Sequence, residues 1–481
     1  MDMEITNPFR LLPKVDEVLA REAVSALEAT IGRELMRSLV QEILSDWRSE
    51  IADGVLDSAL LEARLVDLDR ADGLVGRLNK AVAEERGRGI VPAVNGTGIV
   101  LHTGLGRAPV HPEAAAAMAA AAGGFCVVEV DRFSGQRNRR DDRLSELARR
   151  LIGCEAAIAV NNNAAACVLA LTTFANGKET ITSHGELVEI GGSFRMPAVM
   201  EQAGTRLVAV GSTNRTRIGD YQNAITDQTG LLLKVHRSNF ALIGFTEEAS
   251  MEEIATLAAA RGLPSVYDLG AGFLNRGVPG LTPIDGLTGE TLLDDAIASG
   301  ADVVTFSGDK LFGGPQAGIL AGNLGAIEDM RRHPLYRALR LDKVSLAGLE
   351  RTFELYLEGR GDEIPSRELL GRRPEVLLEA ANALFAKLKE LAFFRAGEVV
   401  LEVVASTSQP GSGSAPGVEL ATTCLRIRLS TSGGADKLAD KLRAATPPVF
   451  VRISDGAVWI DLRTLLPGDD ERLLAAFSSL V

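Results

Sequence analysis

Apolar and polar residues follow three different patterns along this chain of 481 residues. Over the first 88 residues, apolar positions recur every three or four residues, as in 15–27 and 35–44, which predicts short amphipathic helices. Between 157 and 320, short apolar runs separate longer helical stretches. After a helical stretch over 374–391, four further apolar runs close the chain. The pattern predicts a helical N-terminal segment, a large α/β region and a smaller α/β region.

The apolar runs of the central region predict strands of a mainly parallel sheet. Most of them recur at intervals of about 25 to 40 residues, which is the spacing of strand–helix–strand units. The predicted strands are 157–160, 179–182, 206–210, 231–235, 265–268, 303–306 and a returning strand over 317–321. Ligands of such sheets bind beyond the carboxyl ends of the strands, so the residues that follow these runs are the first candidates for a site.

Three domains account for these regions, since 46% apolar content is ample material for more than one core. We expect an N-terminal helical domain over 1–88, with Gly87-Arg88-Gly89 as the linker. A large catalytic domain spans 89–345. A linking helix and a small C-terminal α/β domain fill 346–481.

Charge and cysteine content narrow the class of protein. No apolar run is long enough to span a membrane, and the acidic start Met-Asp-Met-Glu lacks the features of a secretory signal. The four cysteines are scattered without a Cys-x-x-Cys pair, so we expect reduced thiols rather than disulfide or metal frameworks. A cytoplasmic enzyme fits these features.

The net charge of −13 is unusual for a protein that grips nucleic acid. The first 90 residues carry twelve Lys or Arg against eighteen Asp or Glu. If this segment binds RNA, it does so by shape and a few placed arginines rather than by a broad basic field. The alternative is a docking or oligomerisation domain.

The strongest chemical signal lies between the last two predicted strands. The run Val303–Phe306 is followed by Ser307-Gly308-Asp309-Lys310 and then by a turn with Gly313-Gly314-Pro315. A lysine at the mouth of a buried strand suits a Schiff base, because partial desolvation lowers its pKa and leaves a nucleophilic amine. A surface lysine in a loop is the alternative. The Ser-x-x-Lys pattern of penicillin-binding enzymes does not apply, because its Ser-Asp-Asn and Lys-Thr-Gly partners are absent.

Two further motifs turn this lysine into a candidate for binding pyridoxal phosphate. Asp268 ends an apolar run about forty residues upstream of Lys310, where it could keep the pyridine nitrogen of the cofactor protonated. Asn161-Asn162-Asn163-Ala164 follows another predicted strand and opens an alanine-rich helix, Cys167 to Phe174, whose free N–H groups suit a phosphate. Each motif is weak alone, but their order and spacing together are specific.

Several motifs together resemble the bacterial selenocysteine synthase family, the L-seryl-tRNA(Sec) selenium transferases. They are Ser307–Gly318, Val160–Ala166, Gly185–Arg195, Thr213–Thr216 and Lys234–Phe240, within a match that begins near Arg10 and covers nearly the whole chain. The resemblance implies an aminotransferase-like fold of type I with pyridoxal 5'-phosphate as cofactor. It also implies a PLP-dependent conversion of L-seryl-tRNA(Sec) to L-selenocysteinyl-tRNA(Sec) through an aminoacrylyl intermediate, with selenophosphate as selenium donor.

The motifs and the resemblance together assign roles to particular residues. Lys310 and Asp268 are the expected catalytic residues. Because Asp309 lies beside the lysine, we add the hypothesis that it assists proton transfer to the leaving hydroxyl. The expected cofactor contacts are Lys310, Asp268, Asn162, Asn163, Ala164, His184 and Ser307. The expected substrate contacts are Arg107, Arg337, Arg340, Arg139 and His236.

Some of these roles have ordinary alternatives. The family usually carries Arg where this chain has His184, so the histidine either stacks on the cofactor or lies at the rim of the pocket. Arg337 and Arg340 are three residues apart and share a face if both lie on one helix, which suits a phosphate-like donor. Arg139 lies in a charged turn that is otherwise an ordinary solvated segment, and Arg107 has the alternative of capping a helix that begins near Pro112.

The resemblance further implies a homo-oligomer, a ring of dimers or homodecamer, with the N-terminal domain recognising the tRNA and no membrane or DNA partner. The main alternative is a PLP-dependent lyase or aldolase that acts on a small phosphorylated amino acid, although such relatives generally lack the N-terminal helical domain. A non-enzymatic RNA-binding scaffold would not need Lys310, Asp268 and the phosphate cradle together.

Overall fold

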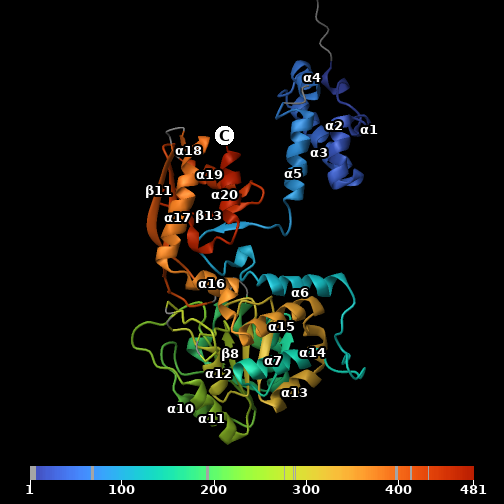
Figure 1. The fold of residues 1–481 in the computed structure, drawn as a ribbon. Helices are drawn as coiled ribbons and strands as arrows, with labels where there is room; N and C mark the ends of the chain where they lie inside the picture. The colour runs from blue at the N-terminus through green and yellow to red at the C-terminus, as the bar shows by residue number, and fades with distance from the viewer. Residues whose placement is uncertain are drawn as a thin grey trace, which may run out of the picture. The chain divides into compact units, whose positions relative to one another are not determined.

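The computed structural model divides into two compact units, Met1–Ala93 and Val94–Val481 (Figure 1). The described residues are 7–66, 70–190, 194–275, 277–284, 286, 287, 289–395, 399–411, 414–431 and 433–480. No helix within these ranges is both long and apolar enough to cross a membrane.

The N-terminal unit is helical, as its periodicity predicts. Its elements are η1 Pro8–Arg10, α1 Val15–Leu19, α2 Glu22–Ile31, α3 Arg33–Ala52, α4 Ser58–Val66 and α5 Leu74–Arg86. Gly32 separates α2 from α3 with a φ of 84°, a conformation that favours glycine. The buried face of α3 carries Met36, Val40, Leu44 and Trp47, which belong to a small core separate from those of the second unit.

The second unit is built on a seven-stranded sheet with the order β2-β10-β9-β8-β7-β3-β6. All neighbours pair in parallel except β10, which runs antiparallel to both β2 and β9. The strands are β2 Ala156–Val160, β3 Glu179–Ser183, β6 Arg206–Val210, β7 Thr229–Val235, β8 Ser265–Gly270, β9 Val303–Ser307 and β10 Gly318–Gly322. The mainly parallel sheet predicted from the apolar runs is confirmed.

Alternate residues of the strands enter two separate cores, because successive side chains of a strand point to opposite faces. On β9, Val304 and Phe306 join one core and Val303 joins the other. Helices cover both faces (Figure 1). The first core is closed by α7 Asp142–Ile152, α10 Ile218–Ala224, α11 Met251–Arg261, α12 Leu293–Ala298 and α15 Lys343–Leu357, and the second by α8 Asn163–Ala175, α9 Met196–Gln202, α13 Leu324–Arg332 and α14 Pro334–Leu339.

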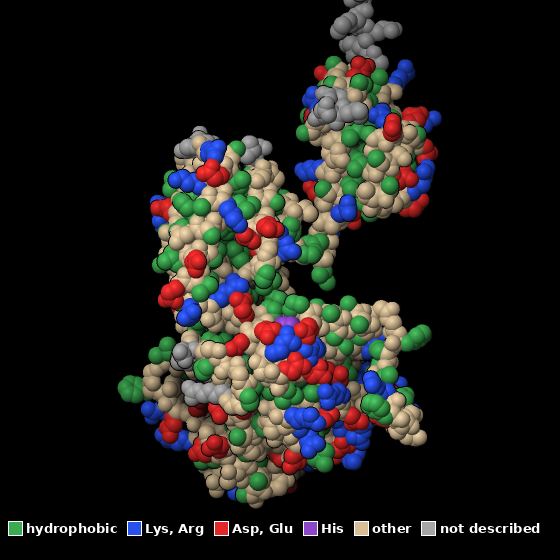
Figure 2. Space-filling model, viewed as in Figure 1, with side chains coloured by type: hydrophobic (Ala, Val, Ile, Leu, Met, Phe, Trp, Pro, Cys, Tyr) green, Lys and Arg blue, Asp and Glu red, His purple; other side chains and the backbone are tan. Residues whose placement is uncertain are grey.

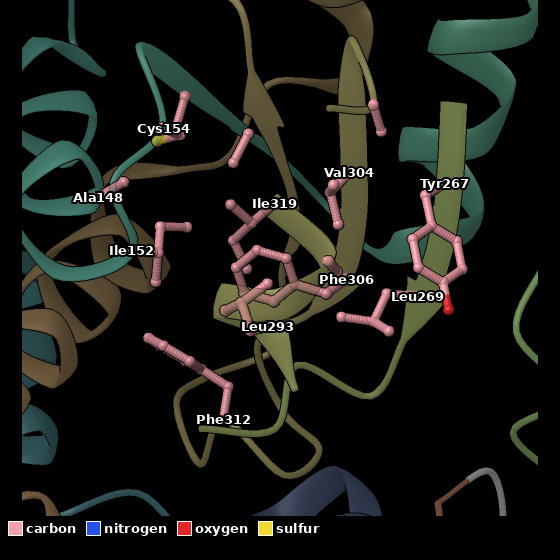
Figure 3. Close-up of a cluster of buried hydrophobic side chains, with 14 of the residues drawn as sticks. Ala148, Ile152, Cys154, Tyr267, Leu269, Leu293, Val304, Phe306, Phe312 and Ile319 are labelled. Carbon is pink, nitrogen blue, oxygen red and sulfur yellow. The ribbon is translucent and has the colours of Figure 1, made fainter. Parts of the chain in front are cut away.

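The turn that carries Lys310 is fixed from both sides. The rings of Phe306 and Phe312 lie 5.7 Å apart between centroids, and Figure 3 shows both in one apolar cluster with Leu269 and Ile319. Tyr356 donates a hydrogen bond from its hydroxyl to the carbonyl of Phe312 at 2.9 Å. The lysine therefore projects from a turn that its aromatic neighbours anchor in the core.

A second sheet of five strands has the order β1-β13-β14-β12-β11. Its strands are β1 Val94–Gly96, β11 Val399–Ser408, β12 Leu420–Leu429, β13 Val449–Ser454 and β14 Ala457–Asp461. Helices α17 Pro374–Lys389, α19 Gly434–Arg443 and α20 Asp469–Ser478 pack on it. Strand β1 comes from a segment expected within the large domain, and it pairs in parallel with β13.

The remaining elements connect these parts. They are η2 Thr103–Leu105, α6 Pro112–Gly123, η3 His184–Glu186, β4 Glu189–Ile190, β5 Phe194–Arg195, η4 Gly361–Glu363, α16 Pro365–Gly371, α18 Ala392–Arg395 and η5 Leu462–Thr464. The imidazole of His111 caps α6 by accepting a hydrogen bond from the backbone N–H of Glu113. The segment between β1 and α6 thus crosses from the small sheet to the large one with Arg107 in its middle.

Candidate active site

Lys310 is the buried centre of the candidate site. Its residue surface is 7% exposed, and it follows Ser307, the last residue of β9. Burial lowers the pKa of the Lys310 amine, and the nearby positive charge of Arg107 lowers it further. The negative charges of Asp268, Asp309 and Glu290 act in the opposite direction on the same pKa. A lysine in this setting has the lowered pKa that a Schiff-base nucleophile requires.

Asp268 lies on the neighbouring strand, with its carboxylate held from two sides. In the sheet it pairs with Thr305, whose hydroxyl donates to Asp268 Oδ1 at 3.1 Å. The side-chain amide of Asn163 donates to the same oxygen at 2.7 Å. These two hydrogen bonds fix the position of the carboxylate, so Asp268 suits a residue that pairs with a protonated ring nitrogen.

The start of α8 forms the predicted anion cradle. Asn162 caps the helix by accepting a hydrogen bond from the N–H of Ala165 at 2.9 Å, and Ala164 lies in the first turn. A Cβ on Gly318 would lie 2.2 Å from the carbonyl oxygen of Asn162, so only glycine lets β10 approach the start of this helix. Gly318 also pairs with Ser307, which places the cradle beside the end of the lysine strand.

The side chain of Asn163 makes a contact that differs from the one expected. Asn163 was expected to contact the cofactor, but its side-chain amide is directed at Asp268 and its Oδ1 is buried without a hydrogen-bond partner among the described residues. Only its backbone N–H remains at the helix start. Sequence reasoning had no signal for this contact, because Asn163 and Asp268 are far apart in the chain.

Arg107 and Asp309 meet beside Lys310. A guanidinium N–H of Arg107 donates to Asp309 Oδ2 at 3.0 Å, and the backbone N–H of Ala108 donates to the carbonyl of Asp309. Arg107 has a φ of 62°, which is uncommon for a residue other than glycine and marks a constrained loop. The helix that begins at Pro112 is capped by His111 rather than by Arg107.

His236 follows β7 and is fixed next to Asp268 by its backbone, whose N–H donates to the carbonyl of Asp268 at 2.8 Å. Its ring nitrogen Nε2 lies 3.4 Å from Oε2 of Glu290. Glu290 and Ser238 were not identified from the sequence. Ser238 lies in the quoted motif Lys234–Phe240 and could have been found there, whereas Glu290 lies in a loop without any motif.

The arginines expected around a single substrate do not all converge within this chain. A cleft with a volume of about 320 Å³ is lined by Glu129, Arg137, Asn138, Arg139, Arg140, Asp141, Glu328, Arg331, Arg332, Tyr336 and Arg340. Arg139 and Arg340 thus lie in one cleft, while Arg107 lies at the lysine. Each is already paired: Arg139 with Glu328 at 2.6 Å and Arg340 with Glu129 at 3.3 Å.

The prediction that Arg337 and Arg340 share a helix was wrong for Arg340. Helix α14 ends at Leu339, and Arg340 is its C-cap with a ψ of 142°. The reason is local, since the backbone of Arg340 leaves the helix to bridge with Val160 at the end of β2. That bridge brings Arg340 to the sheet edge from which the chain continues into the cradle. Arg337 is exposed and does not line the cleft.

His184 is exposed at the end of β3, and β7 separates its strand from β8. The neighbouring Glu186 is buried and receives hydrogen bonds from Lys234 and from the backbone N–H of Val235. Burial raises the pKa of the Glu186 carboxyl. Part of the quoted motif Gly185–Arg195, residues 191–193, lies outside the described residues.

The described surface of the second unit carries no uniformly basic face on the side shown in Figure 2. Basic and acidic side chains are interspersed there over the region of α13 to α15. The arginine cleft also contains both signs of charge, because three carboxylates lie among its arginines. An anionic ligand of this cleft would compete with the carboxylates that already hold the arginines.

Comparison with known proteins matches both units. The family model described as L-seryl-tRNA selenium transferase matches residues 93–466, and the one described as selenocysteine synthase N terminal matches residues 9–48. Curated proteins named L-seryl-tRNA(Sec) selenium transferase are similar over nearly their full length. The protein of Moorella thermoacetica is 43% identical, with 98% of this chain and 97% of the relative covered. That of Solidesulfovibrio magneticus is 41% identical with the same coverage.

Among solved structures, D-glucosaminate-6-phosphate ammonia-lyase shares the fold. The TM-score is 0.55 at 20% sequence identity, and the alignment covers 83% of this chain and 97% of the lyase. At this identity the similarity concerns the fold alone. It agrees with the aminotransferase-like arrangement of type I expected for the large domain.

Proposed function

The chain belongs to the family of L-seryl-tRNA selenium transferases, and we propose that it converts L-seryl-tRNA(Sec) to L-selenocysteinyl-tRNA(Sec). The observation that carries this assignment is the buried Lys310 beside Asp268 in a chain whose relatives of that name match it from end to end. The alternative of a lyase or aldolase on a small phosphorylated amino acid is not favoured, because the similarity to the ammonia-lyase is one of fold.

The residues of the site fit pyridoxal 5'-phosphate. Lys310 supplies a buried amine of lowered pKa, Asp268 a carboxylate on the adjacent strand, and the start of α8 a helix N-terminus that Gly318 keeps accessible. When bound, this group supplies an electron sink for the charge that develops at the α-carbon of the amino acid. Ser307 and Ala164 are proposed to line the phosphate end, and His184 to lie at the rim.

The residues of this chain then divide the work. Lys310 would remove the α-proton of the seryl group, and Asp268 would keep a proton on the ring nitrogen of the bound cofactor. The carboxyl group of the substrate is an ester with the tRNA, so no arginine is needed to bind a free carboxylate. Asp309 holds Arg107 in place.

Selenophosphate is the selenium donor that we propose, with Arg107 as its ligand beside Lys310 and with Arg340, Arg139 and Arg337 on its entry path. Guanidinium groups suit a phosphate-like anion because they donate two parallel hydrogen bonds. We further propose a cytoplasmic homo-oligomer, a ring of dimers or homodecamer, in which the helical domain over 1–88 binds the tRNA. Arginines that are paired with carboxylates in one chain, such as Arg139, are candidates for re-pairing across a subunit contact.

A single-turnover experiment tests the proposal. The protein loaded with pyridoxal phosphate is mixed with serine esterified to tRNA(Sec), with and without selenophosphate, and in parallel with free serine and small phosphorylated amino acids. Formation of selenocysteinyl-tRNA from the charged tRNA alone is the expected result. Reaction of a small amino acid without reaction of the charged tRNA would assign the chain to the lyase alternative.

A further inference from the structure

His236 and Glu290 form a largely buried pair that takes no part in the proposed function as described so far. Nε2 of His236 and Oε2 of Glu290 lie 3.4 Å apart, and neither atom makes a well-formed hydrogen bond to any described residue. The Glu290 side chain has no exposed surface, and its other oxygen, Oε1, accepts a hydrogen bond from the backbone N–H of Ala415. Buried polar atoms are nearly always satisfied, so an unsatisfied pair of this kind points to a functional site.

The pair lies beside the reacting lysine. The backbone of His236 is bonded to that of Asp268, and Glu290 is among the charges that act on Lys310. Two residues after His236, Ser238 approaches the lysine: a Cβ built on Gly270 would lie 3.8 Å from Ser238 Oγ and 3.9 Å from Lys310 Nζ. The loop that carries His236 and Ser238 therefore approaches the Lys310 amine where Gly270 has no side chain.

The exposed part of the His236 ring opens into a cavity. Because Nε2 is buried against Glu290, the 15% of the side chain that remains exposed lies on the rest of the ring. His236 lines a cavity of about 330 Å³ together with Tyr267, Thr291 and Ala415. A carboxylate that holds one nitrogen of an imidazole fixes its tautomer and orientation and leaves the other nitrogen to the ligand.

The proposed reaction needs a residue that donates a proton to the leaving hydroxyl. Lys310 cannot be this donor while it takes up the α-proton. Lys310 takes up the α-proton, while the hydroxyl on the β-carbon must leave as water rather than as hydroxide. Asp309, the donor suggested by the sequence, already accepts a hydrogen bond from Arg107 through Oδ2, so this oxygen is engaged with the guanidinium. Besides Arg107 and Asp309, the ionisable side chains that interact with the lysine or pair with a group that does so include Asp268, Glu290, Cys167 and His236.

We propose that His236 donates the proton to the departing β-hydroxyl and that Glu290 is the positioning residue that orients its ring. The inference rests on the proposed function. In the step, the bond between the β-carbon and oxygen breaks, its electron pair stays with the oxygen, and the His236 proton joins that oxygen to release water. The double bond between the α- and β-carbons forms from the electrons left when Lys310 removes the α-proton. His236 regains its proton from solvent before the next turnover.

The first test separates proton removal from hydroxyl loss. His236→Gln protein is loaded with pyridoxal phosphate and mixed with seryl-tRNA(Sec) in D2O, without a selenium donor. We expect deuterium to enter the α-position at nearly the wild-type rate, while loss of the hydroxyl falls by roughly 100-fold or more. The visible absorption of the bound cofactor and the affinity for the charged tRNA should not change. A purely structural role would slow both reactions together, and that result would overturn the proposal.

A leaving group that needs no proton gives the second test. With tRNA(Sec) charged with β-chloroalanine, chloride departs unprotonated, so His236→Gln should eliminate it at close to the wild-type rate. Failure of this rescue would show that the histidine does not act as the acid. If wild-type protein eliminates neither hydroxyl nor chloride from the charged tRNA, the proposed function itself has failed rather than this inference.

Glu290→Gln keeps the shape of the side chain and its acceptor for Ala415 while removing the charge. We expect a loss of hydroxyl elimination of about tenfold that chloride also rescues, with α-deuterium exchange unchanged. The matched control is Glu363→Gln, since Glu363 forms another Glu–His pair with His111 at 3.6 Å, away from Lys310 and half exposed. Asp309→Asn completes the set. If it loses hydroxyl elimination with chloride rescue and His236→Gln does not, Asp309 is the donor and our assignment falls.

Discussion

The site around Lys310 and the arginine cleft are both rich in charge, but they are built in opposite ways. At the lysine, Lys310, Asp268 and Asp309 are almost fully buried. Hydrogen bonds from the neighbouring strand β9 and from the start of α8 hold the Asp268 carboxylate. In the cleft, Arg139 is more than half exposed and already paired with a carboxylate, and Arg340 is paired in the same way. Buried groups cannot exchange partners without a large cost, whereas exposed ion pairs exchange them readily. The first region is therefore suited to bond making, and the second to reversible binding.

Replacing Lys310 should have the largest effect in the molecule. Lys310→Ala removes the amine that follows β9, so we expect activity to fall by at least about 1,000-fold and the imine absorption of the bound cofactor to vanish. Lys310→Arg is the control for charge and volume, since a guanidinium stays charged and forms no Schiff base. Retention of the imine band in either variant would place the cofactor on another lysine.

Asp268→Asn should follow, with a loss on the order of 100-fold in the rate of α-proton exchange. The amide keeps the hydrogen-bonding shape next to Asn163 and Thr305 but no longer favours a proton on the ring nitrogen. Asp302 offers a matched control, because its carboxylate accepts hydrogen bonds from Ser265 at the opposite end of the same pair of strands. Asp302→Asn should lower the thermal midpoint and leave the exchange rate per folded molecule intact.

Lys310 and Asp268 were also candidates that could be predicted from the sequence alone. A buried strand has a short apolar signature, and the residue after it is placed at the sheet edge by the strand itself, so Lys310, Asp268 and the start of α8 follow from local pattern. The contacts of Asn163 with Asp268, of Arg107 with Asp309 and of His236 with Glu290 join segments that are distant in the chain. They depend on strand order and loop path, for which the local pattern carries no signal.

The same limit explains the errors of detail. The short strand β1 has only three residues, and its pairing with β13 is decided more than 350 residues away. The backbone of Arg340 leaves α14 because Val160 offers it a bridge, not because its own sequence ends the helix. Long helices such as α3 and α15 were predicted from the sequence, because their apolar residues recur at helical spacing over several consecutive turns.

Gly318→Ala tests the rigidity of the first region at the cofactor cradle. The added methyl group would collide with the backbone of Asn162 and Asn163, so we expect about 1 to 3 kcal/mol of lost binding free energy, or roughly 5- to 150-fold in the dissociation constant of pyridoxal phosphate. Gly322→Ala is the control on the same strand, where a Cβ would lie 2.0 Å from the carbonyl oxygen of Asp302, far from the cradle. It should reduce stability without weakening the cofactor. If both variants weakened cofactor binding equally, the start of α8 would not be the site that binds the cofactor phosphate.

Charge around Lys310 should shift its titration in opposite directions in two variants. Arg107 lowers the pKa of the Lys310 amine, so Arg107→Met should raise that pKa and reduce the free amine present at neutral pH. Asp309 raises the same pKa, so Asp309→Asn should lower it. The measurement is the rate at which protein stripped of cofactor captures pyridoxal phosphate as a function of pH. The rising limb should move to higher pH in the first variant and to lower pH in the second, and a shift of both in one direction would contradict the assignment.

The smallest effects belong to the cleft, and their form distinguishes it from the lysine site. Arg340→Gln should raise the KM for selenophosphate by about 3- to 10-fold with little change in kcat, because a partly exposed charge contributes about 1 kcal/mol to anion binding. The effect should shrink as ionic strength rises, since exposed pairs are screened by salt. Arg332→Gln is the control, an arginine of the same cleft that is three-quarters exposed and pairs with Asp329. A drop in kcat that persists at high salt would instead place Arg340 with Arg107 at the reacting atoms, and the two regions would then work as one site.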